Sequence, residues 1–438
     1  MIKNRIAPIS CSVLLAILLY FILTSRVLGA TYYVDSINGN DLNNGKYKTS
    51  AWKTIQHAAN ISIAGDTTIV MEGTYNEKIV LRNSGHSEDK IIIKSYPRRV
   101  AEINGGFKID KNYIRIEGFK ITSNIVGRTA IEIEGDYVEI VDNYCFNVKG
   151  KAIRGNLNKK PKGVYIAKNH IYNSQMGIVI EGDSWLVENN EIELLYDYGA
   201  GDCDYVRFFG DHNVIRNNYF HGTKQSDIGS AHVDCFQTWH NHPDRNARNI
   251  LIEKNKCFGF HQGFMGEVGG RPDLINHITF KNNVFKFYSD FYPSGYGIFN
   301  KGIPYVAVIN NTFIDIRYRA VYMDDGAENA VVKNNIFYNC NLSYSFSGSS
   351  SKGDYNLMYL TPNNPNKGTH DLIGVDPLFV NPDNNDFNLK PSSPAFGSGE
   401  SGTNIGATFQ SSSNAGVPPN KPSSSGCFCS TVTLLNYN

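Results

Sequence analysis

The sequence predicts an all-β protein: a single-stranded, right-handed parallel β-helix solenoid with a short N-terminal capping helix. Three observations lead to this fold class. An Asn-marked motif recurs along the chain, short runs alternate apolar and polar residues, and the 438 residues are too many for one ordinary compact core. A solenoid escapes this size limit because each coil packs only against its neighbours.

The repeat is a short β-rich run that ends in Asn-Asn or a near equivalent and continues into apolar or aromatic residues. Successive markers follow one another at intervals of 26, 21, 28, 38, 27, 28 and 24 residues, at Asn143, Asn169, Asn190, Asn218, Lys256, Asn283, Asn311 and Asn335. These intervals are too short for propeller blades, and the leucine-rich pattern is missing. Asn tolerates the left-handed conformation and can bond from coil to coil, so we interpret these residues as structural.

The coils and the two ends are predicted from local patterns. Alternation indicates strands at 113–117, 138–141 and 278–281. An amphipathic helix over 52–64 is expected to cover the first coil with Trp52, Ile55, Ala59 and Ile61, and strands near 68–71, 79–81 and 91–94 begin the solenoid. Strands at 376–380 and 387–389 are expected to close the other end.

The chain divides into three parts. Residues 1–30 read as a signal peptide, with a basic start, an apolar run and small residues before Thr31; a single transmembrane anchor is the alternative. Residues 31–409 form the β-helix domain, with its N-terminal cap at about 31–66. Residues 410–438 are rich in Ser and Pro and predict a flexible tail. The expected location is therefore extracellular, periplasmic or the cell surface.

Charge and cysteine content restrict the partners. Lys and Arg number 42 against 41 Asp and Glu, so no field of one sign indicates a nucleic acid, or a membrane once the signal is removed. We expect a monomer. Seven of the eight Cys follow the signal peptide, so at least one is unpaired, and their spacing matches no zinc motif.

Both ends of the chain resemble a known group. Segments 31–35, 39–41, 51–56 and 65–75, together with 376–379, 393–395 and 404–407, look like the opening and the close of secreted right-handed β-helix proteins of the pectate-lyase-like superfamily. The resemblance implies the fold, but the superfamily contains polysaccharide lyases, glycoside hydrolases, epimerases and members without known activity. The polygalacturonase motif set is missing apart from an isolated Asp324-Asp325-Gly326, and so is the Asp-Pro-His motif of uronan epimerases.

One irregular coil carries the sharpest functional signal. The interval of 38 residues, between Asn218 and Lys256, marks an enlarged coil that is rich in His, and its neighbours add further polar groups. The predicted catalytic residues are Asp204, Arg207, His232, Asp234, His261 and Glu267. The predicted substrate-binding residues are Gln237, Trp239, Gln262, Tyr296 and Tyr322, and a Ca²⁺ site is predicted at Asp202, Asp204 and Asp234.

Two registers place these groups differently. Counting from the Asn markers sets Asp204 level with His232, whereas aligning the strands sets Asp204 level with Asp234. Either register keeps Asp204 one coil from both residues, about 4.8 Å away. Purely structural roles are the alternative: turn-forming carboxylates, an ion-paired Arg207 and a His261 bonded to backbone.

The residue set fits two mechanisms on a polysaccharide. In a lyase, Ca²⁺, or Arg207 with Gln237, neutralises a uronate carboxylate and His232 or Arg207 removes the C5 proton. In a hydrolase, two carboxyls among Asp204, Asp234 and Glu267 act on the glycosidic bond. A glycan-binding solenoid without activity predicts scattered polar residues instead of one cluster. The first choice is therefore an exported lyase, with a hydrolase as the alternative.

Overall fold

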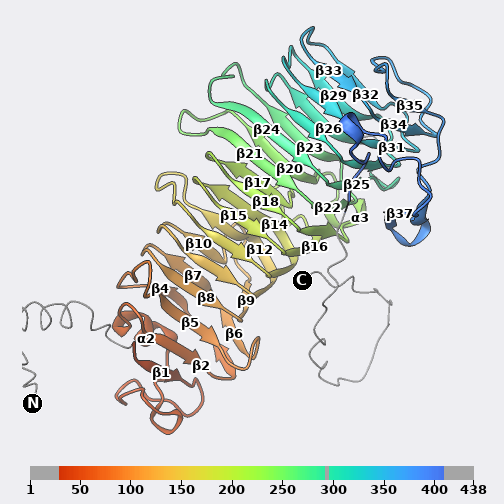
Figure 1. The fold of residues 1–438 in the computed structure, drawn as a ribbon. Helices are drawn as coiled ribbons and strands as arrows, with labels where there is room; N and C mark the ends of the chain where they lie inside the picture. Colours follow the sequence, from red (N-terminus) through yellow and green to blue (C-terminus); the bar gives the residue numbers. More distant parts are fainter. Residues whose placement is uncertain (1–28, 292–294, 409–438) are drawn as a thin grey trace, which may run out of the picture.

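The computed structural model describes residues 29–291 and 295–408 as one elongated solenoid (Figure 1). The signal peptide predicted for residues 1–30 lies almost entirely outside these residues, and so does the predicted tail. In the part of the chain that the structure describes, no helix is long and apolar enough to cross a membrane. The strands pair in parallel from coil to coil, which confirms the predicted β-helix fold class.

Each regular coil contributes to three stacked faces, which we call A, B and C. Face A contains β1 (Thr31–Val34), β2 (Thr67–Val70), β5 (Ile91–Ser95), β8 (Ile114–Glu117), β11 (Glu139–Val141), β13 (Tyr165–Ala167), β15 (Leu186–Glu188), β18 (Val214–Arg216), β21 (Ala247–Glu253), β24 (Ile275–Lys281), β27 (Ala307–Ile309), β30 (Val331–Lys333) and β33 (Lys352–Asp354).

Faces B and C are joined by two long strands, β12 (Tyr144–Gly155) and β14 (His170–Glu181), which run through both. Face B also contains β3 (Gly73–Tyr75), β6 (Ala101–Asn104), β9 (Lys120–Ser123), β16 (Glu191–Leu195), β19 (Tyr219–His221), β22 (Lys256–Phe258), β25 (Val284–Lys286), β28 (Thr312–Ile314), β31 (Ile336–Tyr338), β34 (Leu357–Tyr359) and β35 (Leu372–Ile373). Face C also contains β4 (Lys78–Val80), β7 (Gly106–Ile109), β10 (Ile131–Ile133), β17 (Val206–Phe209), β20 (Asp234–Trp239), β23 (Gln262–Glu267), β26 (Tyr296–Lys301), β29 (Arg319–Asp324) and β32 (Tyr344–Phe346).

The core is a set of apolar stacks along the solenoid axis. Alternate residues of each strand point inward, so one residue from each coil stands on its counterpart in the next. On face A the fully buried stack runs through Ile93, Ile116, Ile140, Ile166, Val187, Ile215, Ile252, Phe280, Val308 and Val332. Because every coil is buried between two neighbours, the core lengthens with the chain without becoming thicker.

A ladder of buried Asn side chains lies at the bend between faces A and B. In each step the backbone N–H and Nδ2 of one Asn donate to Oδ1 of the next, as Asn143 does to Asn169 at 3.0 and 3.1 Å. The ladder runs through Asn143, Asn169, Asn190, Asn218, Asn255, Asn283, Asn311, Asn335 and Asn356. The predicted marker Lys256 was therefore wrong by one residue: Asn255 is the ladder member.

The two properties that suit Asn to this bend are divided between neighbouring positions. The ladder Asn makes the hydrogen bonds, whereas the residue before it adopts the left-handed conformation, with φ between 54° and 59° along the ladder. That preceding position accepts other residues, including Asp142, Lys168, Lys254 and Tyr355. The Asn-Asn pairs in the sequence thus reflect two separate requirements.

The N-terminal cap differs from its prediction in three details. The helix α2 (Ile55–Ile61) is shorter than the predicted 52–64 and buries Ile55, Ala58 and Ala59, whereas Ile61 is 42% exposed. Trp52 precedes the helix and forms a bridge to Val34. Face A begins with β1, which pairs with β2, so the solenoid starts before the strands that were predicted to begin it. A short η1 helix (Lys48–Ser50) lies between β1 and α2.

The C-terminal segment does not close the end of the solenoid; it folds back along face B (Figure 1). Its strands β36 (Phe379–Asn381) and β37 (Asp386–Leu389) pair antiparallel, with η2 (Pro382–Asn384) between them and η3 (Glu400–Gly402) after them. Apolar residues of this segment pack on outward side chains of face B from β22 to β34, including Phe258, Val284, Ile314, Ile336 and Leu357. The prediction that strands 376–380 and 387–389 close the end was therefore wrong in position.

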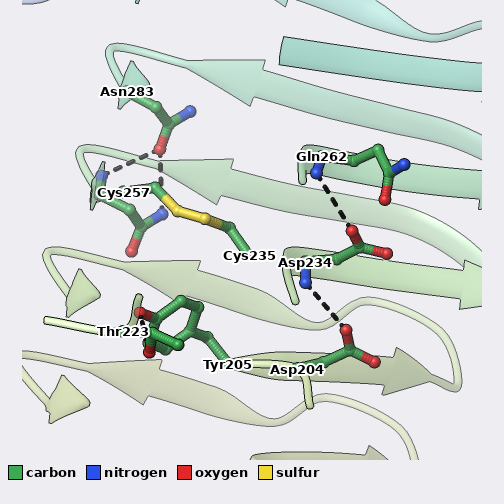
Figure 2. The surroundings of a disulfide bond; sticks show 9 residues. Asp204, Tyr205, Thr223, Asp234, Cys235, Cys257, Gln262 and Asn283 are labelled. Atoms are coloured by element: carbon green, nitrogen blue, oxygen red, sulfur yellow. Dashed lines mark hydrogen bonds between the residues drawn. A yellow bond between two sulfur atoms is a disulfide. The ribbon is translucent and has the colours of Figure 1, made fainter. Parts of the chain in front are cut away.

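The enlarged coil is confirmed, and its extra residues occupy two places. Its ladder step is 37 residues, from Asn218 to Asn255. The helix α3 (Gln225–Ile228) lies between β19 and β20, and a loop after β20 carries Arg245. A disulfide joins Cys235 of this coil to Cys257 at the start of the next coil (Figure 2). Cys145, Cys203 and Cys340 are buried and free among the described residues.

Candidate active site

The predicted cluster forms on face C, on strands β17 and β20 and the segments that precede them. Val206 pairs with Phe236 and Arg207 with Gln237, so the register inferred from strand alignment holds. The register counted from the Asn markers was wrong, because the α3 insertion comes between β19 and β20. Asp202 is instead the residue bridged with His232.

Two buried carboxylates stand one above the other at the start of this cluster. Asp204 and Asp234 are 1% and 0% exposed. Oδ1 of Asp204 accepts the backbone N–H of Asp234 at 3.0 Å, and Oδ1 of Asp234 accepts the backbone N–H of Gln262 at 3.2 Å (Figure 2). The carboxylates are therefore held by the chain of the next coil, as rigidly as the strands themselves.

An interior contact follows each of these carboxylates in the sequence. Tyr205 turns into the solenoid, where its hydroxyl lies 2.7 Å from Oγ1 of Thr223. Cys235 turns inward in the same way and is bonded to Cys257. In Figure 2 both carboxylates lie on one side of the strands, and Tyr205 and the disulfide lie on the other. These contacts fix the chain directly behind the two acids.

Arg207 is the counter-ion of the cluster. Its Nε donates to Oδ2 of Asp204, and one terminal nitrogen donates to Oδ2 of Asp202. The Asp234 carboxylate is completed by the Gln237 amide, which donates at 3.3 Å, and by the Gln262 amide, whose nitrogen can donate to it. The predicted substrate-binding residues Gln237 and Gln262 thus also support a carboxylate.

The two histidines of the cluster differ in accessibility. His232 has a half-exposed ring whose Nδ1 lies 3.3 Å from Oδ1 of Asp202 and 3.8 Å from Oδ2 of Asp234. His261 is buried, and its Nδ1 accepts the backbone N–H of Val233 at 3.0 Å. Its ring packs on the edge of Phe291. Of the two, only His232 presents an imidazole to solvent.

Burial shifts the pKa values of Asp204, Asp234 and Arg207. Burial, with the neighbouring Asp234, raises the pKa of Asp204 well above its ordinary value. Burial raises the pKa of Asp234 to about 8, against the hydrogen bond from Gln262 and the charge of Arg207. Burial lowers the pKa of Arg207 to about 10. At neutral pH the two acids therefore hold at least one proton between them.

The pKa values of both histidines are lowered. Burial, and then the charge of Arg207, lower the pKa of His232 below its ordinary value. Burial and the neighbouring His232 lower the pKa of His261 to about 4, against the charge of Asp290. Both imidazoles are therefore neutral at pH 7, which is the form that can accept a proton.

A second layer of charge beside the cluster was not predicted from the sequence. Glu181 is 1% exposed, and its Oε1 accepts from Arg245 at 2.9 Å and from Arg154 at 3.5 Å, while Oε2 has no hydrogen bond. Arg154 shares a register row with Arg207, and Arg245 belongs to the enlarged coil. The register row shared with Arg207 could have revealed Arg154, and the position in the enlarged coil could have revealed Arg245.

The remaining predicted residues lie farther along face C. Glu267 pairs in register with Trp239 and forms an ion pair with Lys301 at 3.5 Å. Gln262 is the residue of β23 that pairs with Asp234, and Glu267 lies five residues farther along this strand. At the usual rise per residue of a β-strand, this is roughly 16 Å. Trp239 packs against Arg207 and Arg245, whose guanidinium carbons lie 5.1 and 5.2 Å from its ring centre. Glu267 and Trp239 therefore lie beside the paired acids Asp204 and Asp234 and not among their hydrogen-bond partners.

The two predicted tyrosines belong to an aromatic strip that extends the cluster. Tyr296 is one strand beyond Gln262 in the same row, and it stacks on Phe299 and Tyr318 at 4.7 and 5.5 Å. Tyr322 stacks on Phe299 at 5.4 Å. The strip, of which Phe299 and Tyr318 were not predicted, offers partly exposed apolar rings along the solenoid axis.

The predicted Ca²⁺ site fits the observed contacts poorly. Ca²⁺ takes six to eight oxygen ligands. One oxygen of each buried acid, Asp204 and Asp234, already accepts a backbone N–H, and Arg207 contacts the other oxygen of Asp204 and one of Asp202. Oδ1 of Asp202 is buried without a hydrogen bond, which leaves one free oxygen. In this arrangement Arg207 supplies the positive charge that Ca²⁺ was predicted to supply.

A hollow on the solenoid surface lies apart from the cluster. It has a volume of about 850 Å³ and lies at the turn between faces B and C, where Lys286, Tyr288, Asp290, Arg317 and Leu360 line it. None of the predicted catalytic residues contributes to it. In the cluster itself the side chains of His232 and Asp202 are 46% and 29% exposed, whereas Arg207 is 13% exposed and the two acids are buried.

Comparisons with known proteins show what the chain is similar to. No protein-family model matches it. The uncharacterized protein YwoF of Bacillus subtilis (strain 168) is 31% identical over 173 residues, and the match spans 32% of this chain and about a third (36%) of that protein.

Solved structures resemble it more broadly and at lower identity. They include pectate lyase Pel9A (15% identity, TM-score 0.46, 88% of this chain and 98% of that one) and a rhamnogalacturonan lyase (15%, 0.44, 80% and 91%). A GH136 lacto-N-biosidase from Eubacterium ramulus is 13% identical, with a TM-score of 0.44 over 78% and 68% of the two chains. These likenesses concern the fold, and no residue role is taken from them.

Proposed function

We propose that the protein is an exported polysaccharide lyase that cleaves a glycan by β-elimination at a uronic acid residue. The observation that carries the proposal is His232. It is the half-exposed imidazole of the cluster, it lies against Asp202, and its pKa is lowered, so it is neutral at pH 7. Nδ1 of His232 lies 3.3 Å from the Asp202 carboxylate, which leaves Nε2 of the neutral ring as the candidate base.

The neighbouring groups fit the other requirements of β-elimination. The C5 proton becomes acidic only when the uronate carboxylate is neutralised, and Arg207 and the Gln237 amide can donate hydrogen bonds to that carboxylate. His232 then removes the C5 proton, its electron pair forms the C4–C5 double bond, and the C4–O bond breaks. The leaving oxygen takes a proton from water. Tyr296 and Tyr322 provide rings on which further sugar units can rest.

A glycoside hydrolase is the second candidate, and Asp234 is the observation that favours it. A carboxyl with a pKa of about 8 is protonated at neutral pH, as a general acid must be. Against this, Asp204 and Asp234 are both buried, and Glu267 lies roughly 16 Å from the level of Asp234 along the strands, beyond the 5 to 9.5 Å that separates hydrolase carboxyls.

The test is a screen of uronic-acid and neutral polysaccharides with the purified protein. A lyase gives products that absorb in the ultraviolet through the new double bond, whereas a hydrolase gives only new reducing ends. We expect absorbance, and a loss of rate of about 10²- to 10⁴-fold in His232→Ala. The control is His277→Ala, a histidine that stacks on Tyr305 outside the cluster.

Each alternative gives its own result. Reducing ends without absorbance favour the hydrolase, and no product on any glycan, together with retained binding, favours a non-catalytic glycan-binding solenoid. If a chelator abolishes the activity, Ca²⁺ at Asp202, Asp204 and Asp234 is favoured as the group that neutralises the uronate carboxylate. If the activity survives the chelator, Arg207 is favoured for this role.

A further inference from the structure

A second cluster of ionisable side chains lies on face B, on the strands β14, β16 and β19 of three successive coils. His170 pairs in register with Glu191, and Glu193 pairs with His221. The two glutamates are alternate residues of the middle strand, so both point outward on the same side. A histidine from each neighbouring coil therefore faces them.

Each histidine of this cluster contacts the glutamate that is diagonal to it and not the one with which it pairs in register. Nε2 of His170 lies 3.2 Å from Oε2 of Glu193, and Nε2 of His221 lies 3.0 Å from Oε1 of Glu191. One nitrogen of His170 and one oxygen of each glutamate lie within 4.8 Å of one another. The side chains are between 18% and 44% exposed, so an ion from solvent can reach them.

Aromatic rings hold both imidazoles from the side. His221 stacks on Tyr219 with ring centres 4.0 Å apart, and His170 packs on Tyr144 at 5.0 Å. The buried residues that pack with the C-terminal segment on face B begin at Phe258, and Tyr219 packs against their edge. The cluster is thus restrained by its own strands and rings, and it is accessible.

We propose that His170, Glu191 and Glu193, joined by His221, bind a divalent transition-metal ion, with Zn²⁺ as the ion of choice. Imidazole nitrogen and carboxylate oxygen are ligands that Zn²⁺ takes, at about 2.0 to 2.2 Å, in a tetrahedral arrangement. Ligand atoms around such an ion stand about 3.3 Å apart. The ligand atoms of His170, Glu191 and Glu193 already lie within 4.8 Å of one another, and His221 contacts Glu191, so rotation of the side chains brings these atoms towards that geometry.

Binding replaces the two diagonal hydrogen bonds by metal–ligand bonds. Each imidazole ligates in its neutral form through Nε2, with its proton on Nδ1. Because the four ligands come from three coils, the ion ties those coils together on the outside of the solenoid. The thermal stability of the protein should therefore rise when Zn²⁺ is added.

Ordinary surface ion pairs are arranged differently. His370 with Asp354, and His242 with Asp244, each join one imidazole to one acid. Among the described residues, three ligand-type side chains converge within 4.8 Å only on face B and at Asp202, Asp204 and His232 on face C. The face C set has Arg207 among its carboxylates, whereas the ion pairs of the face B glutamates, within the described residues, are those with His170 and His221.

The experiment titrates metal-stripped protein with Zn²⁺ against a chromophoric chelator and follows thermal unfolding with and without Zn²⁺. It uses the Asp204→Asn/His232→Ala variant as the parent, so that the face C set cannot contribute. We expect one Zn²⁺ per chain and a raised melting temperature. His170→Gln/Glu193→Gln should weaken binding by more than about 100-fold, since even loss of an outer partner of a metal ligand costs 10- to 100-fold.

Two controls keep the result decisive. His370→Gln removes an unrelated His–Asp pair and should bind Zn²⁺ like the parent. His221→Gln, with Glu193 intact, should weaken binding by itself, and melting in the presence of chelator shows that each variant is folded. Unchanged Zn²⁺ binding in folded His170→Gln/Glu193→Gln, or no stoichiometric binding by the parent, overturns the proposal.

Discussion

The side chain of Asp204 accepts the backbone N–H of Asp234 at 3.0 Å, so one buried acid holds the strand that carries the next. Neighbouring strands are about 4.8 Å apart, and both carboxyls are removed from water. The pair therefore cannot lose both protons cheaply, and this energetic coupling gives the protein a measurable dependence on pH.

Asp234→Asn should remove a pH-dependent loss of stability. The pKa of Asp234 is about 8 in the folded protein and near 3.8 in the unfolded chain, so the folded state binds the proton more tightly between these values. Its contribution is complete below about pH 4 and is lost as the pH rises towards 8. Thermal unfolding across this range should show the variant gaining on the parent protein as the pH increases.

The control for this experiment is Asp211→Asn. Despite partial burial, the hydrogen bonds from Arg248 hold the pKa of Asp211 below its ordinary value, so its contribution is present above about pH 4 and lost below it. That variant should be less stable than the parent above about pH 4, by an amount that stays constant as the pH rises further, and the difference should shrink below pH 4. If the melting temperatures of the parent and of Asp234→Asn change in parallel with pH, the raised pKa of Asp234 is contradicted.

Arg207→Ala should destabilise the protein strongly near neutral pH. The Arg207 side chain is 13% exposed and contacts Asp202 and Asp204, and removing one partner of a buried ion pair costs about 3 to 5 kcal/mol. Denaturant unfolding measures the loss. Arg248→Ala is the matched control, because its pair with Asp211 is 41% exposed on the arginine side and contributes at most about 1 kcal/mol. Equal losses would mean that Arg207 is not the counter-ion.

Removing the disulfide should cost about 3 kcal/mol of stability. Cys235 and Cys257 are 22 residues apart, and closing a loop of that length lowers the entropy of the unfolded chain by this amount. Cys235→Ala/Cys257→Ala should unfold at lower denaturant and should not respond to a reducing agent, whereas the parent should. Cys340→Ala removes a buried free thiol and should keep the parent's response. A double variant as stable as the parent would argue against this crosslink.

The two positions of the Asn-marked bends should respond in opposite ways, which one variant in each of two neighbouring bends tests. Asn283→Ala leaves the backbone N–H of Asn255 and other buried groups without partners, so we expect a loss of about 2 to 5 kcal/mol. Lys254→Gly replaces an exposed residue at φ 55° with the one that adopts this conformation freely, so stability should stay constant or rise by up to about 1 kcal/mol. Denaturant unfolding of both variants measures the change in stability. A similar loss of stability in Asn283→Ala and Lys254→Gly would contradict the separate roles of the two positions.

The sequence determined the fold class, since inward-facing residues and Asn markers are local patterns that repeat at the length of one coil. It also located the irregular coil, because an insertion changes the interval between markers. Asp204, Arg207, His232 and Asp234 were found in this way, and the structure brings them together.

Tertiary structure decided what depends on register and on distant segments. The two alignments of Asp204 could not be separated from the sequence, because α3 adds residues at a place that the interval alone does not reveal. Glu267 lies on the predicted face but too far along its strand. Glu181 and Arg245 meet across 64 residues. The C-terminal strands lie along face B instead of over the end, because their apolar residues pack on outward-facing apolar residues there. A local sequence pattern does not reveal which distant segment a strand will pack against.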